Sequence, residues 1–165
     1  MITGKRISLK TILLSGLLVG TLDILSAFAD VYINTGKNPL IVLNYIASGA
    51  FGKTDFTSGN NGALMGLLFH YIIAFAFTFL FFWLYDKINL RGINWIVTGI
   101  VYGLFIWMVM NLIVVPLSNA PHKPLSEMQF KKALKAALIL ICMIGLPLSL
   151  IANYVSKRAA QNKTS

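Results

Sequence analysis

Four long apolar stretches, separated by shorter polar connections, dominate the pattern along this chain. Each stretch is long enough to cross a hydrocarbon core about 30 Å thick at about 1.5 Å of helical rise per residue. Apolar positions run on without the alternation that barrel strands show, and a helix satisfies every backbone polar group within its own segment. The pattern therefore predicts four membrane-spanning helices, at Leu9–Val31, Ala63–Tyr85, Asn94–Val115 and Ala133–Val155.

The composition supports the same class of protein. Hydrophobic residues make up 57% of the 165 residues and charged residues only 12%, with a mean hydropathy of +0.75. These values lie outside the usual balance of a soluble globular domain. We predict an all-α fold, an integral membrane four-helix bundle that forms a single membrane domain over residues 1–165.

A short helix is predicted between the first and second spans. Asn38 is placed as its cap, Pro39 as its first residue and Gly49 as its stop, so that the helix covers residues 39–48. This segment is apolar nearly all round but too short to span a membrane. It either lies in the interface as a lid over the bundle or enters the membrane as a re-entrant pore element.

The formal charge of +9 comes from basic residues that are scattered over both termini and every connection. This distribution suits anionic lipid head groups better than nucleic acid, so we predict membrane lipids as partners and no nucleic acid. Lysine and arginine counts also predict the orientation, with both termini in the cytoplasm. Eight basic residues lie on the side of the termini (Lys5, Arg6, Lys10, Lys87, Arg91, Lys157, Arg158 and Lys163) and six on the other side (Lys37, Lys53, Lys123, Lys131, Lys132 and Lys135).

The amino-terminal stretch also resembles a secretory signal. Basic residues precede an apolar run, and Ala27-Phe28-Ala29 forms an A-x-A pattern just before Asp30. The run is long for a signal sequence, however, and Asp23 interrupts it. We expect the first span to be retained; cleavage after Ala29 would leave three spans.

Ionisable residues inside two of the predicted spans are the main candidates for function. Asp23 lies eight residues from the end of the first span and His70 seven residues from the start of the second. Both side chains are therefore expected roughly 10 to 12 Å inside the same membrane boundary. Together with Asn111 of the third span, Asp23 and His70 are predicted to form a polar intramembrane seam.

Small residues indicate where the helices approach one another. A glycine pair at GxxxG spacing lets two helices pack closely, and each of the first three spans carries one. We predict that the packing residues are Gly16, Gly20, Gly62, Gly66, Gly99 and Gly103. In the fourth span, Pro147 removes a backbone donor and is predicted to kink the helix near Met143.

Three interpretations of the polar seam remain open. Its side chains could be hydrogen-bonding contacts between helices, a pathway for protons or solutes, or part of a membrane-embedded enzyme. The last is weakly supported, since no nucleophile–base–orienter set and no two-histidine motif is present. We predict no catalytic residue, no metal site and no cofactor; Cys142 is the only cysteine and falls within the fourth span.

The stretches Val42–Phe75 and Tyr102–Ser118, with "GTLDI" at Gly20–Ile24, resemble a group of small, uncharacterised bacterial inner-membrane proteins with four spans. The resemblance covers most of the chain. It implies a four-span architecture with Asp23, His70 and Asn111 at matching positions, and it implies no activity or substrate.

Together these features predict an integral membrane protein that is a structural or assembly component of the membrane, as a homo-oligomer or with a membrane protein partner. The alternative is a small proton-coupled transporter or channel that uses the polar seam.

Overall fold

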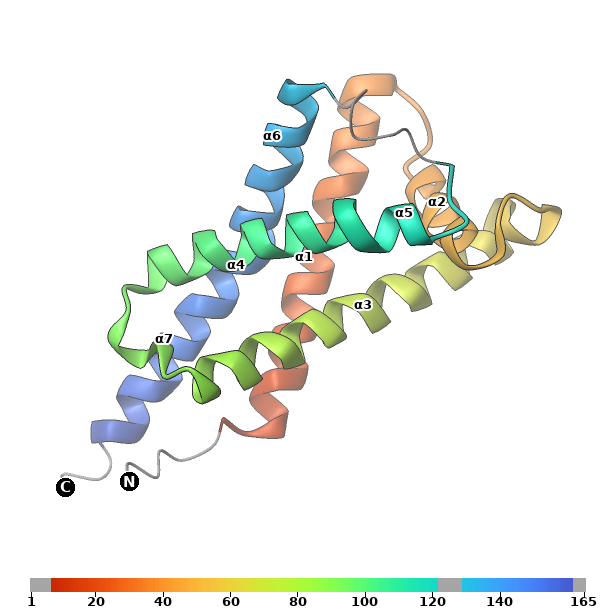
Figure 1. Cartoon of the computed structure of the whole chain (residues 1–165). Helices are drawn as coiled ribbons and strands as arrows, with labels where there is room; N and C mark the ends of the chain where they lie inside the picture. Colours follow the sequence, from red (N-terminus) through yellow and green to blue (C-terminus); the bar gives the residue numbers. More distant parts are fainter. Residues whose placement is uncertain (1–6, 122–128, 162–165) are drawn as a thin grey trace.

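A computed structural model describes residues 7–121 and 129–161 of the chain (Figure 1). The described residues form helices and no strand, which confirms the all-α prediction. Four helices are long and apolar enough to cross a membrane, as expected of a multi-pass membrane protein. They are α1 (Leu9–Thr35), α3 (Gly59–Lys87), a third span over Trp95–Leu117 and a fourth span over Phe130–Ala159.

The helices begin and end at residues with recognisable capping roles. Ser8 Oγ accepts a hydrogen bond from the Thr11 N–H at 3.2 Å at the start of α1, and Asn94 Oδ1 accepts one from the Ile96 N–H at 2.8 Å at the start of α4. Gly36 ends α1 in the left-handed conformation with φ of 64°. The first span begins at Leu9 as predicted, but its end at Thr35, before Gly36, lies four residues beyond the predicted end at Val31.

The third and fourth spans each contain a π-helical segment two residues before a proline. The third span comprises α4 (Trp95–Val109), the π-helical segment Met110–Val114 and α5 (Val115–Leu117), with Pro116 in α5. The fourth comprises α6 (Phe130–Leu140), the π-helical segment Ile141–Gly145 and α7 (Leu146–Gln161), with Pro147 in α7. A proline has no N–H for the carbonyl four residues earlier, and the wider π turn accommodates that loss. The π-helical segment Met110–Val114 therefore allows the third span to continue through Pro116 to Leu117.

The short helix α2 is longer than the sequence pattern indicates. It runs over Leu40–Phe51, continues through Gly49 and ends at Gly52, which has φ of 74°. Asn38 Oδ1 accepts a hydrogen bond from the Leu40 N–H at 3.0 Å, so Asn38 has the expected capping contact. After α2, single 3₁₀ turns follow at Asp55–Thr57 and, between α3 and α4, at Leu90–Gly92.

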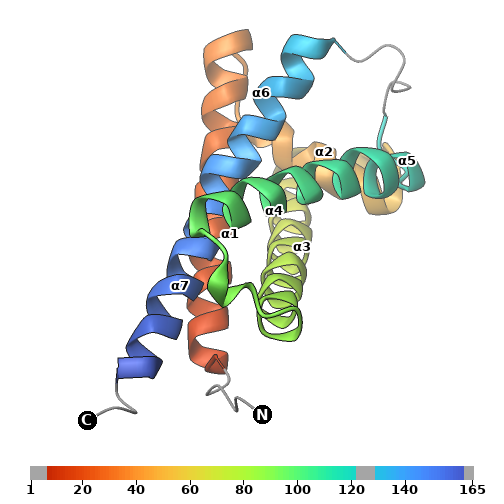
Figure 2. The same ribbon diagram turned by 60° about the vertical axis from the view of Figure 1, so that its left-hand side comes forward.

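The start of α1, the end of α7 and the connection from α3 to α4 lie toward one end of the molecule (Figures 1 and 2). The carboxyl end of α1, α2 and the end of α5 lie toward the opposite end. The start of α1 and the end of α7 therefore lie on the same side, as expected for a chain that crosses a membrane four times. Four residues counted in the orientation prediction, Lys5, Arg6, Lys123 and Lys163, lie outside the described residues.

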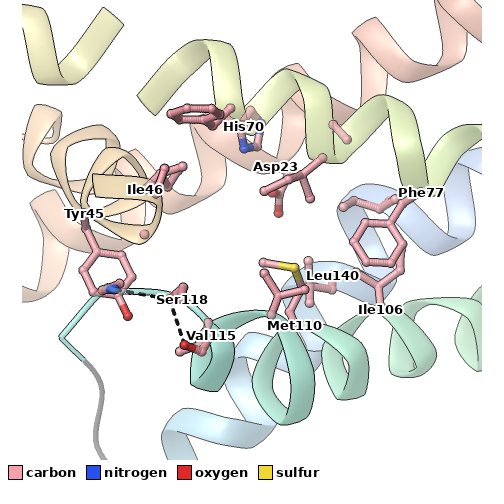
Figure 3. Close-up of a pocket in the computed structure, with 18 residues that line it drawn as sticks. Asp23, Tyr45, Ile46, His70, Phe77, Ile106, Met110, Val115, Ser118 and Leu140 are labelled. Atoms are coloured by element: carbon pink, nitrogen blue, oxygen red, sulfur yellow. Dashed lines mark hydrogen bonds between the residues drawn. The ribbon is translucent and has the colours of Figure 1, made fainter. Parts of the chain in front are cut away.

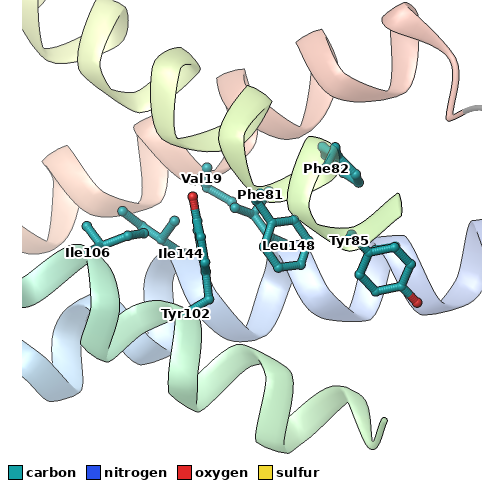
Figure 4. Close-up of a cluster of buried hydrophobic side chains, with 9 residues drawn as sticks. Val19, Phe81, Phe82, Tyr85, Tyr102, Ile106, Ile144 and Leu148 are labelled. Carbon is teal, nitrogen blue, oxygen red and sulfur yellow. The ribbon is translucent and has the colours of Figure 1, made fainter. Parts of the chain in front are cut away.

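A cluster of buried hydrophobic side chains joins the four spans (Figure 4). Phe81 is completely buried, and its ring centroid lies 4.7 Å from that of Tyr102. Val19 of α1 and Leu148 of α7, both completely buried, complete the contact between the four spans. Many large hydrophobic side chains on the spans are exposed, as expected for helices in contact with lipid.

The six predicted packing glycines all lie where another segment approaches closely. A Cβ atom built on any of them would meet an atom of a neighbouring segment closer than an ordinary van der Waals contact. Gly16 and Gly20 face α3, Gly62 and Gly66 face α2 and the turn before α3, and Gly99 and Gly103 face the fourth span. Gly145 contributes from the opposite side, against the backbone of Gly99 and Gly103.

Hydrogen bonds between spans supplement this packing. Thr21 Oγ1 and Tyr71 Oη lie 2.8 Å apart between α1 and α3, and the Tyr102 hydroxyl donates to the Phe77 carbonyl at 2.5 Å between α4 and α3. The completely buried Ser149 donates to the Trp95 carbonyl at 2.6 Å and so ties α7 to α4. Such bonds each contribute on the order of 1 kcal/mol within a membrane.

Ser149→Ala is accordingly expected to lower the free energy of unfolding by about 1 kcal/mol, because the Trp95 carbonyl loses its partner on α7. Reversible unfolding by SDS in mixed micelles measures the change. Ser26→Ala is the matched control, since Ser26 donates only to the Asp23 carbonyl of its own helix. Equal effects of the two substitutions would contradict a stabilising role for the bond between α7 and α4.

Candidate functional site

A cavity of about 370 Å³ lies between the spans and α2 (Figure 3). Its walls come from α1, α2, α3, the stretch from α4 to α5 and the fourth span around its π-helical segment. Both π-helical segments contribute to it, through Met110 and Val114 in the third span and Ile144 in the fourth. The volume is within the range of small-molecule sites in proteins.

Asp23 supplies the only carboxylate on the described walls of this cavity. Its side chain is half-buried and points into the space between α3 and the stretch from Met110 to Ser118 (Figure 3). Among residues 7–121 and 129–161, no hydrogen bond or ion pair to the Asp23 carboxylate is present. An unpaired charge inside a membrane costs at least about 3 kcal/mol, so this carboxylate requires a proton or a cation as its partner.

His70 lies beside Asp23 and is fixed by a contact to α1. The side chain is 8% exposed, and its Nε2–H donates to the Gly20 carbonyl at 2.8 Å. Because that carbonyl can only accept, Nε2 carries the hydrogen and Nδ1 is the nitrogen left to accept a proton. The His70 ring is close enough to Asp23 for an electrostatic interaction between the two groups.

The structure brings two of the three predicted seam residues together. Asp23 and His70, which helical rise predicts at a common depth, both line the cavity. Asn111 is not among the residues that line the cavity, and its side-chain amide donates at 2.8 Å to the Trp107 carbonyl of its own span. Asp30, on the same face of α1 as Asp23, is paired with Lys135 and accepts a hydrogen bond from Asn34 at 3.0 Å.

The remaining polar side chains of the cavity are Tyr45 and Ser118, at its α2 side. Ser118 is engaged locally, because it donates to the Val115 carbonyl at 2.8 Å. Tyr45 also lines a second hollow of about 590 Å³, whose other walls include Lys53, Thr54 and Thr57. Partial burial raises the pKa of the Tyr45 phenol, so the hydroxyl stays protonated and available as a donor.

The segment after α5 is held against α2 and so closes this side of the cavity. The Asn119 N–H donates to the Gly49 carbonyl at 2.9 Å, and its side-chain amide donates to the Ala50 carbonyl at 3.1 Å. Both carbonyls belong to the last turns of α2, beyond the end that the sequence pattern indicated. The additional residues at the end of α2 therefore supply the carbonyl groups that hold the segment after α5.

Apolar and aromatic side chains form the rest of the described cavity wall, and no lysine or arginine is among them. No group of three or more histidine, cysteine or acidic residues in the described part of the chain is placed to hold a metal ion. Cys142 is on the exposed surface of the fourth span, away from the residues that line the cavity. The arrangement is therefore suited to binding a solute and exchanging a proton, with a single carboxylate as its charged group.

Several cavity residues carry no signal in the sequence. Tyr45, Phe69, Phe77 and Met110 are ordinary members of apolar helices, and nothing in their spacing sets them apart from side chains that face lipid. Pro116 and Pro147 are the nearest available signals, because both proline-linked π-helical segments reach the cavity.

Comparisons with known protein families, with curated proteins and with solved structures find no match to this chain.

Proposed function

We propose that this multi-pass membrane protein binds a small, largely apolar solute in the cavity and couples its movement to protons. The observation that carries this function is the Asp23 carboxylate, which faces the cavity beside His70 without a hydrogen bond or ion pair among the described residues. A carboxylate in such surroundings is stable when it carries a proton or when a solute group takes the place of that proton. The proton and the solute therefore compete for the same group, the Asp23 carboxylate.

His70 is suited to assist this exchange. Its Nε2–H donates to the Gly20 carbonyl, which orients the ring and leaves Nδ1 as the nitrogen that can accept a proton, on the same cavity wall as Asp23. Tyr45 lines both the cavity that contains Asp23 and the neighbouring hollow, whose walls include the more polar residues that follow α2. These contacts support a path from the cavity toward that end of the protein.

Proteoliposomes that contain a trapped pH-sensitive dye test this function. Addition of small aromatic solutes of positive, neutral and negative charge is expected to cause proton movement with at least one of them in the wild-type protein. Asp23→Asn should abolish that movement, because the amide cannot release a proton. Asp30→Asn is the matched control on the same helix, since Asp30 is paired with Lys135 away from the cavity.

Two results would contradict the proposed function. One is the absence of solute-dependent proton movement in the wild-type protein with all three solutes. The other is unchanged movement in the Asp23→Asn, His70→Gln double variant, because it would show that neither group handles the proton.

The second candidate function is a structural or assembly component of the membrane, as a homo-oligomer or with a membrane protein partner. The hydrogen bonds between spans favour it, since the His70–Gly20 and Thr21–Tyr71 contacts are ordinary packing devices. This function predicts that Asp23→Asn lowers the yield of folded protein and leaves no separable activity. A folded Asp23→Asn protein that has lost a specific flux would exclude it.

We further propose that the protein belongs to the group of small bacterial four-span proteins that it resembles and lies in the inner membrane with both termini in the cytoplasm. Support comes from the start of α1 and the end of α7, which lie toward a common end of the molecule (Figure 1), and from the small excess of basic residues predicted on that side. Anionic lipid head groups are the partners that these residues suit.

A further inference from the structure

We propose, on the basis of the function proposed above, that the solute is an organic cation with an apolar body and that its positive group pairs with Asp23. This step concerns the chemical class of the solute in the same cavity. It follows from the charge on the cavity wall, the character of the rest of the wall and the proton balance at Asp23.

The charge of the cavity is complementary to a cation. Asp23 is the one acidic side chain on the described wall, and no lysine or arginine lies on that wall to neutralise it. An anionic solute would meet a carboxylate with no lysine or arginine on the described wall and with His70 as the one basic side chain beside it, and a neutral solute would leave an ionised Asp23 without a counter-charge. A cation is the solute class that removes the cost of an ionised Asp23.

The remainder of the wall suits an apolar body. Ile73, Ile106, Met110 and Leu140 present aliphatic and thioether surface to the cavity. Phe69 and Phe77 add aromatic rings from α3, and a positive group within about 6 Å of a ring face is attracted by it. A strongly hydrated inorganic ion needs several oxygen ligands, and the described wall offers it one carboxylate among mostly apolar side chains. The wall therefore favours a bulky, weakly hydrated organic cation.

Binding of the cation balances the loss of one proton. As the cation enters, the O–H bond of a protonated Asp23 breaks and its proton leaves to solvent or to Nδ1 of His70, while the electron pair stays on the carboxylate. One positive charge enters as one leaves, and no oxidant or reductant takes part. The exchange therefore leaves the net charge of the cavity unchanged once the proton has departed to solvent.

A pair of probes with the same shape tests the solute class by calorimetry on the full-length protein in detergent at one fixed pH. Phenyltrimethylammonium carries a permanent positive charge, and tert-butylbenzene is its neutral isostere. We expect the wild-type protein to bind the cation more tightly than the neutral probe. Asp23→Asn should weaken binding of the cation by about tenfold or more and change binding of the neutral probe by less than about threefold.

The neutral probe also shows whether the variant cavity is intact, and Asp30→Asn serves as the matched control that should bind both probes like the wild type. Equal or tighter binding of tert-butylbenzene by the wild type, or equal effects of both substitutions on the cation, would overturn the cation assignment and leave a solute-binding cavity in place. Failure of the wild-type protein to bind either probe would contradict the proposed function itself, and the cation assignment would fall with it.

Discussion

Replacing Gly66 with alanine is expected to lower the free energy of unfolding by about 3 kcal/mol or more. Gly66 is a buried residue of α3, and a Cβ atom there would overlap the Leu43 carbonyl group of α2. Backbone cannot rotate away as a flexible side chain can, so α2 must shift. Alanine favours a helix over glycine by only about 1 kcal/mol, so the overlap determines the sign.

Gly49→Ala is the matched control for this substitution. Gly49 also lies within a helix, and a Cβ atom there would have its nearest contact with Ser118 Cβ at 3.7 Å, an ordinary van der Waals distance. We expect the control to be neutral or slightly stabilising. SDS unfolding in mixed micelles measures both variants, and a Gly66→Ala protein as stable as Gly49→Ala would mean that α2 does not pack closely on α3.

The same substitution has a consequence for the cavity. Tyr45 and Ile46 reach the cavity from α2, so displacement of that helix removes one wall. Weaker binding of both probes by Gly66→Ala is therefore consistent with loss of the cavity, whereas Asp23→Asn should affect the cation alone. The two variants distinguish damage to the fold from loss of the charged group.

Phe81→Ala is expected to destabilise the protein by about 2 to 3 kcal/mol. Loss of the phenyl ring vacates roughly 100 Å³ in the cluster formed with Tyr102 and Leu148, and a residual cavity costs about 24 cal/mol per Å³. Transfer to lipid adds little, because acyl chains are as apolar as the interior of the bundle. The cost is therefore mainly lost packing between spans.

Phe79→Ala provides the control for this substitution on the same helix. Phe79 is 42% exposed, whereas Phe81 is completely buried. A change below about 0.5 kcal/mol is expected for Phe79→Ala under the same SDS unfolding conditions. Similar losses at the two positions would show that the aromatic cluster does not hold the spans together.

The two π-helical segments connect the helix packing to the proposed solute exchange. Each precedes a proline, and each contributes side chains to the cavity wall opposite or beside Asp23. Gly145, in the segment of the fourth span, also lies against the backbone of Gly99 and Gly103. Part of the cavity wall and a close contact between the third and fourth spans are therefore built from the same stretch of chain.

The sequence by itself determined the class of the protein and the position of its ionisable groups along the spans. The length of the apolar stretches identified four helices, because a segment that crosses a membrane must form its backbone hydrogen bonds within itself and so is helical independently of its neighbours. Helical rise placed Asp23 and His70 at the same depth, and both line one cavity. Glycine spacing marked the positions of close approach, since these depend on the absence of a side chain.

Only the tertiary structure decided which groups meet. His70 donates to the Gly20 carbonyl, Asn111 turns to its own span, and α2 continues through Gly49 to meet Asn119. These outcomes depend on how each helix is rotated and where it crosses its neighbours. Helices in lipid are apolar on every side, so hydrophobic periodicity does not mark the inward face as it does in a water-soluble protein. The cavity is assembled from five separate segments, so its shape depends on contacts between residues that are far apart in the chain.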